Sequence, residues 1–189
     1  EVKAAWPYAW VNGMDYPHKD QRGSVTGKLT LNDPQAATTK LPHLTVGLAH
    51  PDYTGGGGDF ARRSGNGNLV TWEHDGNHYE FWVDGKEDGT FNISNVRPGT
   101  YTLHAFADGV LGEIAQTDIT VEAGKNLDLG KIKWTPVRYG KQIWEIGYPN
   151  RTAEEFFKGD NSNYWVWGWP ERYALLFPND ITYTIGKSD

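Results

Sequence analysis

Histidine and acidic residues meet in the segment 73–78 (EHDGNH), where four side chains could bind a metal ion: Glu73, His74, Asp75 and His78. Imidazole and carboxylate are zinc ligands, and the chain has no cysteine to supply thiolate. Zinc ligands normally lie on a helix or on paired turns, with a third partner in view. This segment shows neither arrangement. We therefore predict a polar turn here and no metal site.

Two other groups of residues could bind a metal ion or take part in catalysis. The acidic turn with Asp84, Glu87 and Asp88 could bind Ca²⁺, but it lacks the spacing and the closing bidentate glutamate of a calcium loop. His18 and Lys19 could supply a base and a cation, but neighbours on an extended chain point to opposite sides. We therefore predict an acidic hairpin turn in the first case, and no catalytic residue in the second.

Aromatic residues give the best candidate for a binding surface. Tyr164, Trp165, Trp167 and Trp169 follow one another closely, and alternate residues of an extended strand share a face. Rings spaced in this way could stack on successive sugars of a polysaccharide. The alternative, which we prefer, is that they pack against other parts of the protein.

Arg151 is a further candidate for sugar binding. Its guanidinium could pair with the carboxylate of a uronic acid, or with Glu154 or Glu155 of its own segment. Such short-range pairs are common on helices, so we expect the internal pair.

Composition and charge exclude several classes of partner. The chain has 189 residues and a net charge of −6 without basic clusters, which argues against a nucleic acid partner. No apolar run approaches the length of a membrane span. Asn92 and Asn150 each begin an N-x-S/T sequon, so both are candidates for glycosylation and favour secretion slightly.

The stretch 23–136 is predicted to be an all-β sandwich, because short alternating segments are separated by turn residues throughout it. The expected strands are 23–33, 44–50, 79–83, 90–93, 101–107, 114–121 and 127–134. Gly27 should mark a bulge or a close approach of two chains. Asp88-Gly89 and Pro98-Gly99 should reverse the chain. Residues 51–68 are interpreted as a glycine-rich surface loop.

The character of the sequence changes after residue 136. Strands are predicted over 142–147, 164–169 and 181–185, and a short helix over 151–158 with Thr152 as its N-cap. These elements are too few to make a domain by themselves.

Three separated motifs carry a family resemblance: residues 15–23 (DYPHKDQRG), 144–153 (WEIGYPNRTA) and 179–189 (NDITYTIGKSD). In this order they resemble the rhamnogalacturonan lyases of polysaccharide lyase family 4, and the fungal branch fits best. The stretch 23–136 also resembles fibronectin type III-like and carboxypeptidase-regulatory-like sandwiches, which are accessory domains in many secreted enzymes.

The resemblance implies a three-domain parent: a catalytic β-sandwich, a fibronectin III-like domain and a jelly roll resembling carbohydrate-binding modules. This chain would comprise a linker from the absent catalytic domain (1–22), the fibronectin III-like sandwich (23–136) and the opening strands of the jelly roll (137–189). The family's catalytic base and its assisting Lys and His lie in the first domain, and no position here matches them. Trp6, Tyr8 and Trp10 would line the interface with that domain.

The implied function is a non-catalytic accessory segment of a secreted, extracellular enzyme. That enzyme would cleave the rhamnogalacturonan I backbone of pectin by β-elimination at galacturonate. The implied partners are pectic polysaccharide bound through the parent, the catalytic domain and the remainder of the jelly roll, with no nucleic acid and no membrane. We expect no cofactor here, although the parent could use Ca²⁺. The alternative is a free-standing carbohydrate-binding or structural β-sandwich protein.

Overall fold

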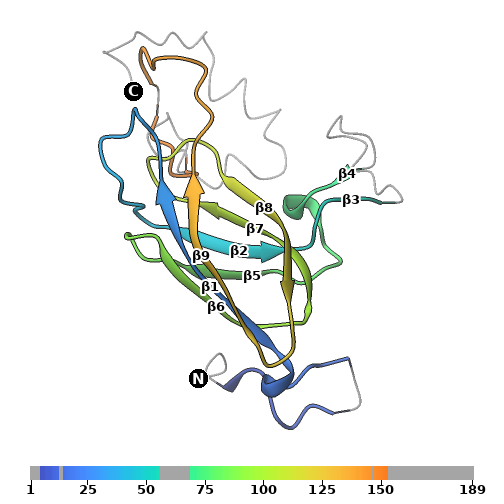
Figure 1. The fold of residues 1–189 in the computed structure, drawn as a ribbon. Coiled ribbons are helices and arrows are strands. Elements are labelled where there is room, and N and C mark those ends of the chain that lie inside the picture. Colours follow the sequence, from blue (N-terminus) through green and yellow to red (C-terminus); the bar gives the residue numbers. More distant parts are fainter. Residues whose placement is uncertain (1–4, 13–14, 56–68, 146, 153–189) are drawn as a thin grey trace, which may run out of the picture. The chain divides into compact units, whose positions relative to one another are not determined.

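A computed structural model describes residues 5–12, 15–55, 69–145 and 147–152 (Figure 1). The chain divides into two compact units, Glu1–Val137 and Arg138–Asp189. All the described strands belong to the first unit, and its only described helices are two short 3-10 turns, so the predicted all-β class is confirmed.

One layer of the sandwich is a three-stranded sheet with the order β6-β1-β9. Its strands are β1 (Gly23–Leu31), β6 (Thr90–Val96) and β9 (Asn126–Trp134). The central strand β1 pairs antiparallel with β6 and parallel with β9. Segments more than sixty residues apart in the sequence therefore lie side by side, as Figure 1 shows.

The other layer is a four-stranded antiparallel sheet with the order β5-β2-β7-β8. Its strands are β2 (Thr45–Ala49), β5 (Phe81–Asp84), β7 (Gly99–Phe106) and β8 (Ile114–Val121). The two sheets lie over one another, so each contributes one face to a shared core (Figure 1). A fibronectin III-like sandwich has this two-layer arrangement.

The core forms where the sequence alternates, since every second side chain of a strand points to the same face. Val25, Leu29 and Leu31 of β1 are buried and meet the buried residues of the opposite sheet, among them Leu48 and Leu103. Deleting such side chains leaves cavities that cost about 2–5 kcal/mol each. The hydrophobic pattern of β1 thus decides which of its faces is inside.

Gly27 marks a close approach of two strands, whereas the bulge lies opposite it on β9. Thr26 and Lys28 pair with Asp128 and Lys131, so Gly27 faces two residues of β9. A Cβ atom at Gly27 would also lie only 2.8 Å from the ring of Phe91. The absence of a side chain is what allows β6 to approach here.

The two predicted reversals are present between β5, β6 and β7. Gly89 donates its amide to the carbonyl of Lys86 at 2.8 Å and adopts a φ of +88°, which glycine tolerates best. After Pro98-Gly99, the buried ring of Tyr101 donates its hydroxyl to the carbonyl of Arg97 at 2.8 Å. A tyrosine that bonds back to upstream backbone recurs in such sandwiches.

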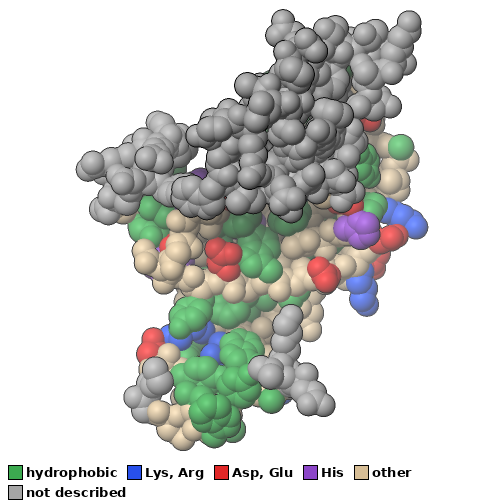
Figure 2. Space-filling model, turned by 180° about the vertical axis from the view of Figure 1, so that it is seen from behind, with side chains coloured by type: hydrophobic (Ala, Val, Ile, Leu, Met, Phe, Trp, Pro, Cys, Tyr) green, Lys and Arg blue, Asp and Glu red, His purple; other side chains and the backbone are tan. Residues whose placement is uncertain are grey.

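The segment before β1 is fastened to the sandwich by two arginines. The guanidinium of Arg22 is 6% exposed, donates to the carbonyls of Pro17 and Asn95, and lies over the ring of Trp6. Arg97 donates to the carboxylate of Asp15 at 2.6 Å. Figure 2 shows hydrophobic side chains gathered at the end of the first unit that this segment occupies.

The expectation of an extended chain is right for His18, whose backbone is extended, but wrong for Lys19. Residues Lys19–Gln21 form a short 3-10 helix, η1, and His18 stands immediately before it. The reason is a local cap, because the amide of His18 donates to the side chain of Gln21 at 2.9 Å. The His18 ring meets the edge of the Tyr16 ring.

A pH-sensitive pair lies beside the start of β2. Nδ1 of His43 lies 2.6 Å from the carboxylate of Asp108, and the hydrogen bond and charge of Asp108 raise the pKa of His43 above 6.5. The stabilisation from this pair is therefore complete below about pH 6.5 and is lost as the pH rises through the raised pKa. NMR titration should show a raised pKa for His43 that falls in Asp108→Asn; an unchanged titration would contradict the pairing.

The described residues of the second unit, 138–145 and 147–152, contain no helix or strand. The predicted strand over 142–147 is therefore wrong for residues 142–145. Ile143 is 90% exposed, and among the described residues no neighbouring strand pairs with this backbone, so alternation alone does not produce a sheet there. The predicted helix beyond residue 152 and the predicted strands over 164–169 and 181–185 lie outside the described residues.

Candidate functional site

The connection from β2 to β5 builds the most concentrated polar site among the described residues. It contains the short ribbon of β3 (Tyr53–Thr54) and β4 (Leu69–Val70), followed by the 3-10 helix η2 (Trp72–His74). Tyr53 pairs with Val70 and Thr54 with Leu69. This pairing brings the end of β2 close to the residues that follow η2.

An aromatic group outside the main core holds η2 in place. The ring of Trp72 lies 4.9 Å from that of Trp82 and 5.6 Å from that of buried His104. Trp82 in turn covers Gly47 of β2, where a Cβ atom would lie 2.1 Å from the indole. Because η2 is anchored on the sheet, the turn after it has a defined position.

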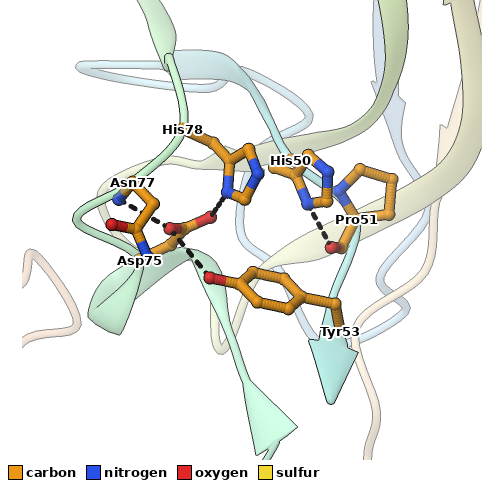
Figure 3. Close-up of polar contacts among 6 residues, drawn as sticks. All are labelled: His50, Pro51, Tyr53, Asp75, Asn77 and His78. Carbon is orange, nitrogen blue, oxygen red and sulfur yellow. Dashed lines mark hydrogen bonds and ion pairs between the residues drawn. The ribbon is translucent and has the colours of Figure 1, made fainter. Parts of the chain in front are cut away.

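Four residues meet at this turn: His50, Tyr53, Asp75 and His78 (Figure 3). The rings of His50 and His78 are stacked, with centroids 3.7 Å apart and planes inclined by 19°. The ring of Tyr53 presents an edge-on contact to both, at 5.3 and 5.2 Å. We refer to these four residues as the histidine cluster.

Asp75 is the anionic centre of the histidine cluster. Its side chain is only 5% exposed, and it receives hydrogen bonds from the amide of Asn77 at 2.9 Å, from Nδ1 of His78 at 2.7 Å and from the hydroxyl of Tyr53 at 3.3 Å. Burial by itself would raise the pKa of Asp75. The hydrogen bonds and the proximity of His78 outweigh burial, so the pKa lies below its ordinary value. The carboxylate is therefore ionised at neutral pH.

Part of this cluster follows from the sequence and part does not. Of the four residues considered in the segment 73–78, the structure brings Asp75 and His78 together. Glu73 and His74 lie on η2, where His74 contacts the hydroxyl of Thr71 instead. The sequence does not indicate His50, because this residue is more than twenty residues away and nothing in the spacing connects it to the turn.

The acidic turn is present between β5 and β6, but the predicted hairpin is wrong, because the two strands belong to different sheets and the turn carries the chain from one sheet to the other. Asp88 lies 3.5 Å from the ammonium of Lys28 and accepts from Thr90, and Glu87 lies 3.4 Å from Lys40. These carboxylates therefore stabilise the turn and its contacts with neighbouring residues.

The predicted sugar-binding rings lie outside the described residues: Tyr164, Trp165, Trp167 and Trp169. Arg151 is exposed and has a φ of +61°, whereas its expected partners Glu154 and Glu155 lie outside the described part. The two sequon asparagines differ in setting. Asn92 is exposed on β6, whereas the carbonyl of the Asn150 side chain accepts from the amide and hydroxyl of Thr152 at 3.0 and 2.8 Å. Glycosylation at either residue stays a prediction.

Comparison with known families agrees with this fold. Residues 57–129 match the model described as polysaccharide lyase family 4, domain II, and residues 142–189 match the model of domain III of the same family. The chain therefore belongs to polysaccharide lyase family 4, and it covers the family's domains II and III.

Curated relatives of the chain come from bacteria and fungi. Rhamnogalacturonate lyase of Dickeya dadantii is 33% identical over 98% of this chain and 26% of its own length. Probable rhamnogalacturonate lyase B is 29% identical in Aspergillus flavus and 31% in A. fumigatus, over 93% of this chain and 25% of each relative. The chain thus spans about a quarter of the length of these relatives.

Two further observations add little about function. A cohesin–X-dockerin complex from Acetivibrio cellulolyticus aligns with 58% of this chain and 52% of its own at 18% identity, but the TM-score is only 0.33. Within the described residues, no helix has the length and apolar character that spanning a bilayer requires.

Proposed function

We propose that this chain is a non-catalytic accessory segment of a secreted rhamnogalacturonan lyase. The observation that carries the proposal is the pair of consecutive matches, domain II over residues 57–129 and domain III over residues 142–189. Residues 1–22 then form the linker from a catalytic domain, residues 23–136 the middle domain and residues 137–189 part of the third. The parent enzyme cleaves the pectin backbone outside the cell.

The charges of the described residues support a structural role for the sandwich. β-Elimination at galacturonate needs a base for the C5 proton and a cation beside the sugar carboxylate. The cations Lys28, Lys40 and Arg97 each pair with a carboxylate of the chain itself. Arg22 is buried among backbone carbonyls and rings. These four cations are engaged by groups of the chain itself, which supports the proposal.

A lyase assay tests the proposed lack of catalysis. We expect the purified chain to produce no ultraviolet absorbance from the double bond that β-elimination creates in rhamnogalacturonan. A full-length family relative with all three domains is the positive control. Steady product formation by this chain that disappears in a His18→Ala/Lys19→Ala variant would overturn the proposal.

The part of the proposal that concerns sugar binding rests on Tyr164, Trp165, Trp167 and Trp169, with Arg151 as an ionic contact. Titration with pectic oligosaccharides should then give a saturable change in tryptophan fluorescence. Trp167→Ala should weaken binding about fivefold, because a stacked ring contributes about 1 kcal/mol. Trp10→Ala, which removes a 77% exposed ring of the N-terminal segment, is the matched control. A flat titration, or an equal loss in both variants, would contradict this assignment.

A further inference from the structure

We propose that His50, Asp75 and His78 form a binding site for a transition-metal dication of the zinc class. One potential ligand atom from each of these residues lies within 4.8 Å of the other two. Two imidazoles and one carboxylate are a ligand set that zinc accepts, and three protein ligands leave a fourth position for water. His50 precedes β3, whereas Asp75 and His78 follow β4 and η2, and Figure 3 shows the three side chains close together.

The hydrogen bonds of His50 leave one ring nitrogen available for a metal. Nδ1 lies 2.8 Å from the carbonyl oxygen of Pro51, and a carbonyl can only accept, so Nδ1 carries the proton. In the neutral ring Nε2 therefore keeps its lone pair. A ligating histidine is commonly oriented in this way, by a hydrogen bond from its other nitrogen to a backbone carbonyl.

Asp75 supplies charge and a fixed position. Its buried carboxylate is oriented by the amide of Asn77 and the hydroxyl of Tyr53, and it lies against Nδ1 of His78. The carboxylate of Asp75 brings a negative charge to the cluster. A dication compensates that charge and uses the same three groups as ligands.

Metal binding would change the present ring geometry in a measurable way. Tetrahedral zinc places its ligand atoms about 3.4 Å apart, closer than the present limit of 4.8 Å. A rotation of the rings that brings the three ligand atoms to the tetrahedral spacing would make their lone pairs converge. The His78 side chain is 39% exposed, which gives it room for this rotation.

Zinc and cobalt binding to the full chain tests the proposal. Competition with a chromogenic chelator should give one Zn²⁺ per chain, and Co²⁺ should give the visible absorption of a site with nitrogen and oxygen ligands. His50→Gln and Asp75→Asn should each lower the association constant at least tenfold. NMR signals of the His50 and His78 rings should shift on addition of Zn²⁺, which reports on the unmodified protein even if a variant folds poorly.

His43 provides a matched control, because it also pairs with a carboxylate, that of Asp108 at 2.6 Å, but lies outside the histidine cluster. His43→Ala should bind Zn²⁺ like the unchanged chain. The proposal is overturned if His43→Ala abolishes binding, if His50→Gln and Asp75→Asn bind normally, or if the rings of His50 and His78 do not respond to the metal. These results do not depend on whether the chain assists a lyase.

Discussion

Arg22→Met should lower the free energy of unfolding by about 3 kcal/mol. The substitution removes the donors to the carbonyls of Pro17 and Asn95, and leaves both acceptors in a partly buried place without a partner. It also removes the guanidinium that lies 4.4 Å from the ring centre of Trp6 and 5.5 Å from that of Tyr16. Hydrogen bonds to a charged group contribute about 1.5–3 kcal/mol, and a cation over a ring about 0.5–2 kcal/mol. Denaturant unfolding measures the loss.

Methionine is the informative replacement because it keeps most of the apolar volume of arginine. Arg22→Lys should lose less stability, since it keeps the charge but cannot donate in two fixed directions. We also expect the ring of Trp6 to become more exposed to solvent in Arg22→Met as the N-terminal segment detaches, which should change the tryptophan fluorescence of the chain. If Arg22→Met unfolds at the same denaturant concentration as the unchanged chain, the segment is not anchored as described.

Gly89→Ala should destabilise the sandwich by at least about 3 kcal/mol. Gly89 has a φ of +88°, and a Cβ atom there would lie 2.0 Å from the carbonyl oxygen of Leu29. That carbonyl belongs to β1, the central strand of its sheet, so the clash can be relieved only by moving the β5–β6 turn or the strand itself. The midpoint of denaturant unfolding should fall clearly, with little change in slope.

Gly112→Ala separates the cost of a positive φ from the cost of a steric clash of the added Cβ atom. Gly112 has a φ of +70°, but nothing lies within 4 Å of the Cβ atom that alanine would add. The free energy of unfolding of this variant should therefore fall only by the cost of placing alanine at a positive φ, about 1 kcal/mol. Equal losses in Gly89→Ala and Gly112→Ala would mean that the close contact with Leu29 contributes nothing.

Alternation and turn chemistry predicted most of the sandwich, because both are local properties of the chain. β8 occupies the segment expected for it, and β1, β2 and β9 differ only at their ends. Asp88-Gly89 reverses the chain and Gly27 allows the close approach of β6, as these residue types predict. Pairing across the sheets could not be derived in the same way. The parallel contact of β1 with β9 depends on residues about a hundred positions apart.

The histidine cluster shows why sites are harder to predict than strands. Its position depends on the ribbon of β3 and β4, and two-residue strands are too short to show alternation. The sequence therefore indicates only the end of a strand at His50 and a polar turn at Asp75 and His78. The strand expected at residues 142–145 failed for the opposite reason, because its alternation is clear but no partner strand is present among the described residues.

Native-state hydrogen exchange of the purified chain tests most directly whether its two sheets close over one core without help from other polypeptide. The account predicts that the slowest amides of β1, β2 and β7 exchange only through global unfolding, at the free energy that denaturant unfolding gives. Residues such as Leu29, Val46 and Leu103 should belong to this group, since their side chains are buried. Rapid exchange of every amide in these strands would contradict a self-contained sandwich.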